Sequence, residues 1–229
     1  MEPGRLVREP KRRRASSPAR KLACMSIGVL LVGTDAASFA QEALEDMACL
    51  AALADLGVQA EPATIDPAEE GCVVEQPVRL RSMASGRNML GFAETPILAC
   101  GFALVLTEWL AEIAIPVAVY HLGQPAAKVL VGPGYACRPH NQQPGAELSV
   151  HAFGIALDIR GFELADGGQI LIGPGDRAAP ERMFLDALRT SACGYFTTVL
   201  GPGSDRHHED HLHVDLASHG SSDHYRICE

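Results

Sequence analysis

Aromatic side chains are scarce in this 229-residue chain, where Phe, Trp and Tyr together make up 5% of the residues. Proteins that bind single-stranded nucleic acid usually stack bases on aromatic rings, and this sequence offers no such platform. Residues 41–229 also carry 11 Lys and Arg against 25 Asp and Glu, a net charge near −14. A body of that charge repels phosphate backbones. We therefore expect no nucleic-acid partner.

Motifs of several enzyme classes are also missing. The sequence contains no GxSxG nucleophile elbow, no GxxxxGK[ST] phosphate-binding loop and no CxxC pair. Long uninterrupted apolar runs are missing too, because Glu108 and Glu112 interrupt the apolar segment 96–116. We predict that this segment is a buried helix ended by Pro116, and we expect no stable membrane span.

The N-terminal forty residues have the features of an export signal. Eight Lys and Arg occur in residues 1–40, and residues 22–33 form an apolar run. That run is shorter than the roughly 20 residues that cross a bilayer, but it suits a signal peptide. Ser38 and Ala40 match the small-x-small cleavage rule. We predict that residues 1–40 are a signal peptide cleaved after Ala40; the alternative is a short N-terminal helix of a cytosolic protein.

Cysteine usage supports export. Residues 41–229 keep an even number of widely spaced cysteines, which favours three disulfides in an oxidising compartment over a zinc cluster. Fifteen pairings are possible. We predict sequential pairing, with six buried free thiols as the alternative; the predicted pairs are Cys49–Cys72, Cys100–Cys137 and Cys193–Cys228.

Hydrophobic periodicity predicts one α+β domain over residues 41–229. Helices come first, and a mostly antiparallel sheet with one packed helix follows. The expected helices cover 41–57, 96–116, 117–123 and 180–193; the expected strands cover 77–83, 128–138, 153–164, 169–172, 195–200 and 211–216.

The stretch HHEDHLHVDL, residues 207–216, concentrates four histidines and three carboxylates. It could be a metal site, a solvated charged loop or an unstructured tract. Alternate residues of a strand share a face, so His211, His213 and Asp215 would lie opposite the apolar residues between them. That alternation favours an ordered strand whose polar face lines a cleft.

A second cluster, SVHAFGIALD, supplies His151 and Asp158. Catalytic zinc sites use three imidazole or carboxylate ligands and leave a fourth position open. His151, Asp158 and either His211 or His213 would form such a set. The alternative is structural: His151 caps a strand and Asp158 forms a salt bridge with Arg160 or Arg138.

These motifs resemble a known family. The pattern S-x-H-x-x-G-x-A-x-D at Ser149–Asp158 and the later H-x-H resemble zinc peptidases that cleave D-alanyl peptides in bacterial cell walls. More closely, the stretch from Cys49 to Cys228 resembles the extensin-like C-terminal domain family, in blocks such as GYACRPHNQQPG and HAFGIALDIRGFELADG. The resemblance implies a Hedgehog/D,D-peptidase-like fold. One departure is Val150, where the family would have glutamate.

The resemblance also implies residue roles. One zinc ion would bind to His151, Asp158 and His213, with Ser149 and Asp215 supporting the ligands. His211 would be the general base, with Asp210 as a rival, and Arg138 would stabilise the oxyanion; alternatively, Arg138 is a surface residue that pairs with the acidic body.

The function that follows is an exported, periplasmic, zinc-dependent hydrolase of peptide bonds in peptidoglycan. The alternative is a non-catalytic zinc-containing module that binds the wall or has a structural role. The sequence leaves the bond cleaved, D,D or L,D, and the oligomeric state open.

Overall fold

A computed structural model describes residues 34–66, 71–220 and 225–229. Along the chain its helices and strands are α1 Thr34–Asp55, β1 Val58–Pro62, β2 Pro77–Ser85, β3 Asn88–Phe92, β4 Ile97–Ala99, α2 Cys100–Trp109, a π-helical segment Leu110–Ala114, α3 Ile115–Leu122, β5 Ala126–Val131, 3-10 turns His140–Gln142 and Val150–Phe153, β6 Ala156–Leu164, β7 Gln169–Leu171, α4 Ala179–Tyr195, β8 Thr198–Leu200, β9 Leu212–Asp215 and β10 Ile227–Cys228.

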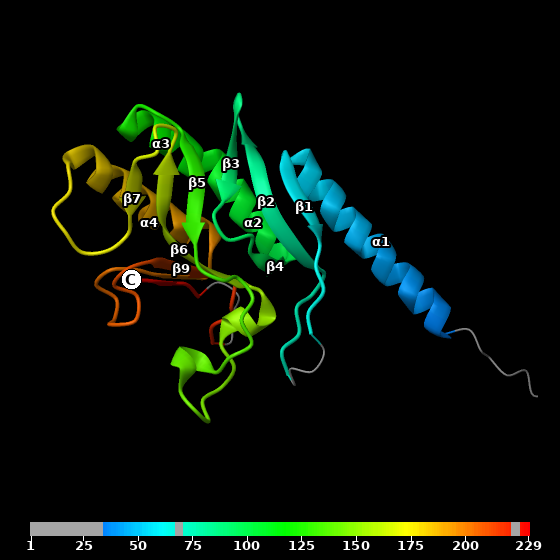
Figure 1. Ribbon diagram of the computed structural model, residues 1–229. Helices are drawn as coiled ribbons and strands as arrows, with labels where there is room; N and C mark the ends of the chain where they lie inside the picture. The colour runs from blue at the N-terminus through cyan, green and yellow to red at the C-terminus, as the bar shows by residue number, and fades with distance from the viewer. Residues whose placement is uncertain (1–33, 67–70, 221–224) are drawn as a thin grey trace, which may run out of the picture.

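The ten strands form one mixed sheet in the order β1-β2-β3-β5-β6-β9-β8-β10, with β4 beside β2 and β7 beside β6. All pairs are antiparallel except β3 with β5 and β10 with β8. Helices α2, α3 and α4 pack against one another and against the sheet, while α1 runs along the β1 edge and extends beyond the body (Figure 1). The predicted α+β class is confirmed.

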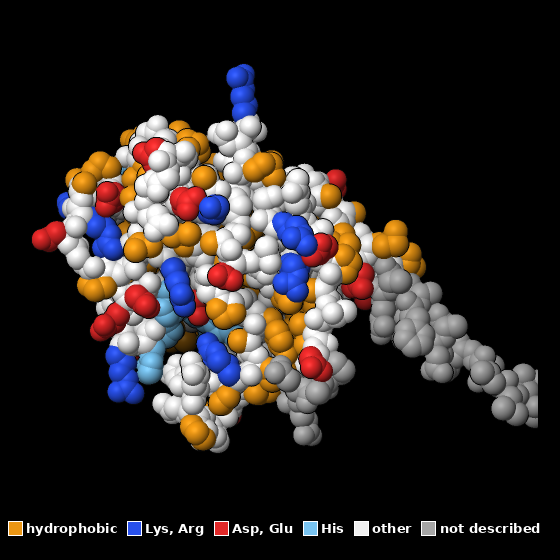
Figure 2. Space-filling view, in the orientation of Figure 1, with side chains coloured by type: hydrophobic (Ala, Val, Ile, Leu, Met, Phe, Trp, Pro, Cys, Tyr) orange, Lys and Arg blue, Asp and Glu red, His pale blue; other side chains and the backbone are white. Residues whose placement is uncertain are grey.

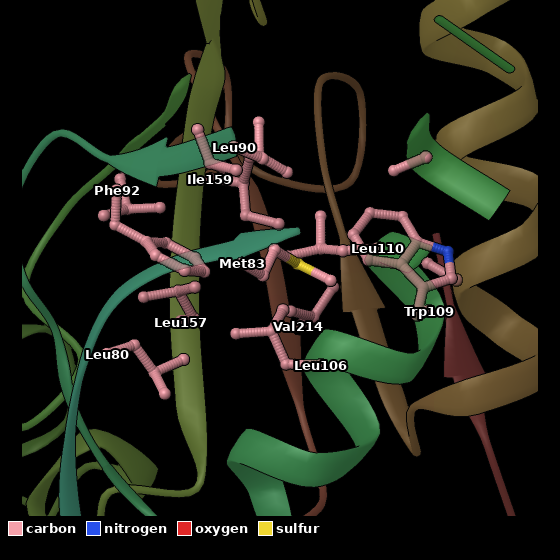
Figure 3. Packing of buried hydrophobic residues seen from close by; sticks show 14 of the residues in the cluster. Leu80, Met83, Leu90, Phe92, Leu106, Trp109, Leu110, Leu157, Ile159 and Val214 are labelled. Carbon is pink, nitrogen blue, oxygen red and sulfur yellow. The ribbon is translucent and has the colours of Figure 1, made fainter. Parts of the chain in front are cut away.

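The hydrophobic core lies between the sheet and helices α2 and α4. Leu157 and Val214, from the central strands β6 and β9, belong to one buried cluster with Leu106, Trp109 and Leu110, and Val214 lies beside Leu106 (Figure 3). All five side chains are fully buried. The apolar faces of β6 and β9 are therefore fixed against the helices, and their opposite faces are left for the polar residues.

The segment Cys100–Leu122 is the one helix in the described part of the chain that is long and apolar enough to cross a membrane. It has 23 residues and a mean hydropathy of 1.8. A core helix of a soluble protein meets the same criterion, and the complete burial of Leu106, Trp109 and Leu110 is what a core helix requires.

The predicted end of this helix at Pro116 is wrong. The helix begins at Cys100, after the short strand β4, and continues through Pro116 to Leu122. Pro116 lies in the first turn of α3, where its missing N–H costs little. The π-helical segment just before it shifts the hydrogen-bond pattern, so the chain continues as a helix.

Other predicted boundaries shift by a few residues. The strand expected over 128–138 ends at Val131, and the strand expected over 195–200 starts at Thr198 because α4 continues to Tyr195. The helix predicted over 180–193 and the hairpin through Asp166, Gly167 and Gly168 are confirmed.

Three disulfides are present, as predicted, and they are typical of an oxidising extracellular or periplasmic compartment. The Cys193–Cys228 pair is confirmed. The predicted pairs Cys49–Cys72 and Cys100–Cys137 are wrong, because the structure has Cys49–Cys100 and Cys72–Cys137. Packing of α1 on α2 brings Cys49 to the first residue of α2. Cys72 therefore pairs with Cys137, which lies in the loop immediately before Arg138.

The predicted signal peptide falls largely on residues 1–33, which lie outside the described residues. Residues 34–40 form the start of helix α1, which continues without a break through Ala40 to Asp55. The cleavage site after Ala40 stays a prediction.

Candidate metal centre

Two of the predicted ligands lie on neighbouring strands. Asp158 of β6 and His213 of β9 are direct partners in the antiparallel register. Nδ1 of His213 lies 2.8 Å from Oδ1 of Asp158. The residues flanking His213, Leu212 and Val214, belong to the core. The alternation predicted for this strand is therefore what aims the imidazole at Asp158.

His151 reaches the same carboxylate from a separate segment, the 3-10 turn Val150–Phe153. Ser149 precedes this turn, and its hydroxyl accepts a hydrogen bond from the backbone N–H of His151 at 3.4 Å. Gly154 ends the turn in the left-handed conformation, with φ of 65°. Nε2 of His151 then lies 3.4 Å from Oδ1 of Asp158. A local turn thus completes a site that the sheet begins.

The three residues fit a divalent cation. Their ligand atoms all lie within 4.8 Å of one another, the only such group in the part of the chain that the structure describes. Two atoms bound tetrahedrally to zinc, each about 2.1 Å from it, lie roughly 3.4 Å apart. The separation of His151 Nε2 from Asp158 Oδ1 matches that value, and the 2.8 Å between His213 and Asp158 is somewhat shorter.

Each histidine also has an oxygen partner on its outer nitrogen. Nδ1 of His151 lies 2.8 Å from the backbone carbonyl of Gly134, and Nε2 of His213 lies 3.0 Å from Oδ2 of Asp215. Metal-ligating histidines typically donate their other ring N–H to a carbonyl or carboxylate, which fixes the tautomer. The pattern leaves Nε2 of His151 and Nδ1 of His213 as the metal-facing atoms.

Without a metal, Asp158 interacts strongly with the charges and hydrogen bonds of the two histidines. Burial opposes ionisation of Asp158, but hydrogen bonds and charge interactions with His151 and His213 outweigh it and hold its pKa far below the usual range. Burial alone would lower the pKa of His213, yet Asp158 and Asp215 raise it to about 9. Two carboxylates therefore stabilise a positive charge at His213, which a bound cation could supply in place of the proton.

His211 lies beside this group without joining it. Its Nε2 lies 3.5 Å from Oδ1 of Asp158, and its Nδ1 lies 2.9 Å from Oδ1 of Asp210. The side chain of Asp210 is 82% exposed and lies on the outer side of the imidazole. The hydrogen bond from His211 is the main reason why the pKa of Asp210 is lowered. The structure thus brings His211 to the candidate ligands and places Asp210 behind it.

A pocket of about 520 Å³ opens onto these residues. Arg138, His151, Asp158, His211, His213 and Asp215 all line it. Figure 2 shows histidine side chains at a hollow of the surface, with Lys and Arg side chains at its edge. Among the described residues Asp158 forms no ion pair with Arg138 or Arg160, so the alternative salt bridge is absent.

His208 also lines the pocket, although the histidine-rich stretch 207–216 does not by itself predict a role for it. The ring centroid of His208 lies 5.2 Å from that of His211 and 5.6 Å from that of His213. Burial lowers its pKa despite a hydrogen bond to Asp205. His219, which lies 2.7 Å from the hydroxyl of Thr198, was missed as a pocket residue. Its sequence context, ASHGSS, contains no motif that marks it.

Comparison with protein-family models gives one match: the model described as "Extensin-like protein C-terminus" matches residues 47–229. Comparisons with curated proteins and with solved structures give no match.

Proposed function

The chain belongs to the extensin-like C-terminal family, and on that basis we propose that it is an exported zinc-dependent hydrolase of peptide bonds in peptidoglycan. One observation carries the proposal: the buried group His151, Asp158 and His213 lines an open pocket together with a further histidine and an arginine. The wall substrate is proposed from the resemblance of the ligand motifs to zinc peptidases that cleave D-alanyl peptides.

His151 Nε2, an oxygen of Asp158 and His213 Nδ1 would hold the ion. When bound there, a zinc ion would supply Lewis-acid chemistry and would lower the pKa of water from about 15.7 toward 7. The chain's own contribution is to fix the ligands: Gly134 and Asp215 hold the two imidazoles in orientation, and the β6–β9 pairing fixes Asp158.

His211 is the residue we propose as general base. Its Nε2 faces the ligand group, so it can accept a proton there and later return one to the leaving amine. Asp210 contacts the opposite nitrogen and would stabilise the protonated imidazole. Asp210 would therefore support the base instead of replacing it.

Arg138 is the residue we propose for the developing negative charge on the substrate carbonyl. It lies in the lining of the same pocket, and the neighbouring disulfide Cys72–Cys137 ties its segment to the domain. A guanidinium held by the protein suits this role, because preorganised donors lose little when charge develops.

A non-catalytic zinc-containing module is the second candidate, because the burial of the ligand group would equally suit a structural ion. His211 and Arg138 distinguish the two candidates, since a structural site needs neither a base nor an oxyanion partner.

The test is release of new amino groups from purified peptidoglycan. Wild-type protein should release them, and His211→Ala should lower the rate by about 10² to 10⁴, the usual contribution of a general base. Zinc content should be the same in both proteins. Equal release by both would reject His211 as the base, and a zinc-loaded wild type without any release would favour the non-catalytic module.

We place the reaction in the periplasm. The three disulfides support an oxidising compartment. A fusion of residues 1–40 to a reporter enzyme that is active only after export would test the signal peptide. An inactive reporter would reject that part of the proposal.

A further inference from the structure

A second pocket, of about 270 Å³, lies between the loop that follows β7, one side of helix α4 and the turn at residues 201–203. Three arginines line it, Arg177, Arg182 and Arg189. This concentration of positive charge stands out in a chain whose net charge is −9.

None of the three arginines forms an ion pair with a carboxylate in the described part of the chain. Both terminal nitrogens of Arg177 donate to backbone carbonyls, of Gly173 and Leu171, each at 2.6 Å. Arg182 and Arg189 each donate one hydrogen bond, to the carbonyls of Arg177 and Pro202. A guanidinium has five N–H donors, so most of the donors of Arg182 and Arg189 are left for a ligand.

The remaining lining is apolar. Ile172, Leu188 and Leu212 are buried, and Leu185 is half-buried beside them. The one acidic residue in the lining, Asp186, is exposed. No ion pair within 4.0 Å joins its carboxylate to the guanidinium nitrogens of the three arginines. A fully hydrated ion would gain nothing from an apolar wall, whereas an anion with a short hydrocarbon part would bury that part there.

This pocket is separate from the candidate metal centre. Leu212 lines the second pocket, whereas its neighbours His211 and His213 line the first, so the two pockets lie on opposite sides of β9. The second pocket therefore does not extend the substrate cleft.

From these contacts we infer that the Arg177–Arg182–Arg189 pocket is a second binding site, which takes a carboxylate joined to a short apolar chain. The guanidinium groups of Arg182 and Arg189 bind the carboxylate, and Ile172, Leu185, Leu188 and Leu212 contact the hydrocarbon. Arg177 holds the loop, because both of its terminal nitrogens are already bonded to backbone. Binding at this pocket does not depend on the proposed hydrolase activity.

The test uses the full chain with butyrate as the probe, followed by NMR of the backbone amides. Saturable shifts are expected at Gly173, Gly175 and Leu185, equally in zinc-loaded and chelator-treated protein. Butyramide has the same shape without the charge and should not bind. Inorganic phosphate has the charge without the apolar chain and should bind at least tenfold more weakly.

Variants locate the binding. Arg182→Gln should weaken butyrate binding about tenfold, as expected for the loss of a charge-assisted hydrogen bond. Arg189→Lys, which keeps a cation near Pro202, should weaken it less. Arg87→Gln is the control, because Arg87 is exposed in the turn between β2 and β3, far along the chain from this pocket. Binding of butyramide as tight as that of butyrate, unchanged binding by Arg182→Gln, or no saturable shift at these amides would overturn the inference.

Discussion

Asp158 and His213 face each other across the antiparallel strands β6 and β9, with Oδ1 of the first 2.8 Å from Nδ1 of the second. Their separation is set by the sheet, because direct partners in an antiparallel pair have Cβ atoms about 4.5–5.5 Å apart. Two of the three candidate ligands are therefore positioned by the same packing that builds the core. His151 alone depends on a loop.

Metal content is the first consequence that can be measured. Purified protein should contain about one zinc per chain by elemental analysis, and His151→Ala should lose most of it because a three-ligand site would keep only two ligands. His121→Ala is a matched control: His121 lies at the end of α3 and does not line the pocket. A wild type that takes up no zinc after dialysis against it contradicts the assignment.

The ligand segments could be predicted from sequence because they depend on local periodicity. Strict alternation in HLHVDL indicates a strand with one polar face, and the structure places Leu212 and Val214 in the core. The spacing of His151 from Asp158 showed only that the residues could meet. Their actual meeting requires the turn at Gly154, and the approach of His213 to Asp158 requires the β6–β9 register, which is a long-range feature. His208 and His219 lie in loops, and hydrophobic periodicity does not predict the path of a loop.

The pairing of four of the cysteines could not be predicted from local sequence either. Sequential pairing minimises loop length, but the observed pairs join Cys49 to Cys100 and Cys72 to Cys137. The packing of α1 on α2 decides this result, and no property of the residues near the cysteines encodes it. Pro116 is a further case, because a local rule predicted a helix end, whereas the π-helical segment before it lets the chain continue as a helix.

The hydrogen bond between Asp215 and His213 should contribute to metal affinity. Asp215→Asn removes the charge behind the imidazole and should weaken zinc binding about 10- to 100-fold, measured by competition with a chromophoric chelator. Asp205→Asn is the control, since Asp205 bonds His208, which is not a predicted ligand. Equal affinities for the two variants would mean that Asp215 does not support the ligand.

Zinc affinity should increase with pH. In the metal-free protein Asp158 and Asp215 raise the pKa of His213 to about 9, so below that pH zinc must displace a proton. Affinity should therefore rise about tenfold per pH unit between pH 6 and 8, accompanied by proton release.

The stability of the metal-free protein should change in the opposite direction. The raised pKa of His213 stabilises the fold below pH 6.5, and this contribution to the free energy of unfolding is lost as pH rises toward 9.

Chelator competition at several pH values measures the first effect, and thermal unfolding with and without chelator measures the second. The zinc-loaded protein is the internal control, because Nδ1 of its His213 would bind the metal and carry no proton to lose. A zinc affinity that is flat from pH 6 to 8 would show that His213 is neutral before the metal binds.

The disulfide Cys72–Cys137 should matter for activity beyond its effect on stability. It closes a 65-residue separation next to Arg138, whereas Cys49–Cys100 closes a separation of 51 residues away from the pocket. Replacing either pair by alanines should lower the free energy of unfolding by similar amounts, about 2–4 kcal/mol. Only the Cys72→Ala, Cys137→Ala protein should release fewer amino groups from peptidoglycan at unchanged zinc content. Equal rates in the two double variants would show that Arg138 does not need this anchor.

Gly154 is the position where backbone and packing constraints on the site coincide. Its φ is 65°, and a Cβ added to it would lie 2.7 Å from Cγ1 of Val74 and 2.9 Å from the backbone nitrogen of Ala99. Gly86 has nearly the same φ, 60°, but no atom lies within 4 Å of the added Cβ. The two glycine-to-alanine variants therefore share the backbone cost, and only Gly154→Ala adds overpacking. We expect Gly154→Ala to lose about 1–3 kcal/mol more unfolding free energy than Gly86→Ala in urea denaturation. We also expect Gly154→Ala to bind zinc more weakly than Gly86→Ala, because the turn that carries His151 must move. Equal losses of stability and of zinc affinity in the two variants would show that the contact at Val74 relaxes without cost.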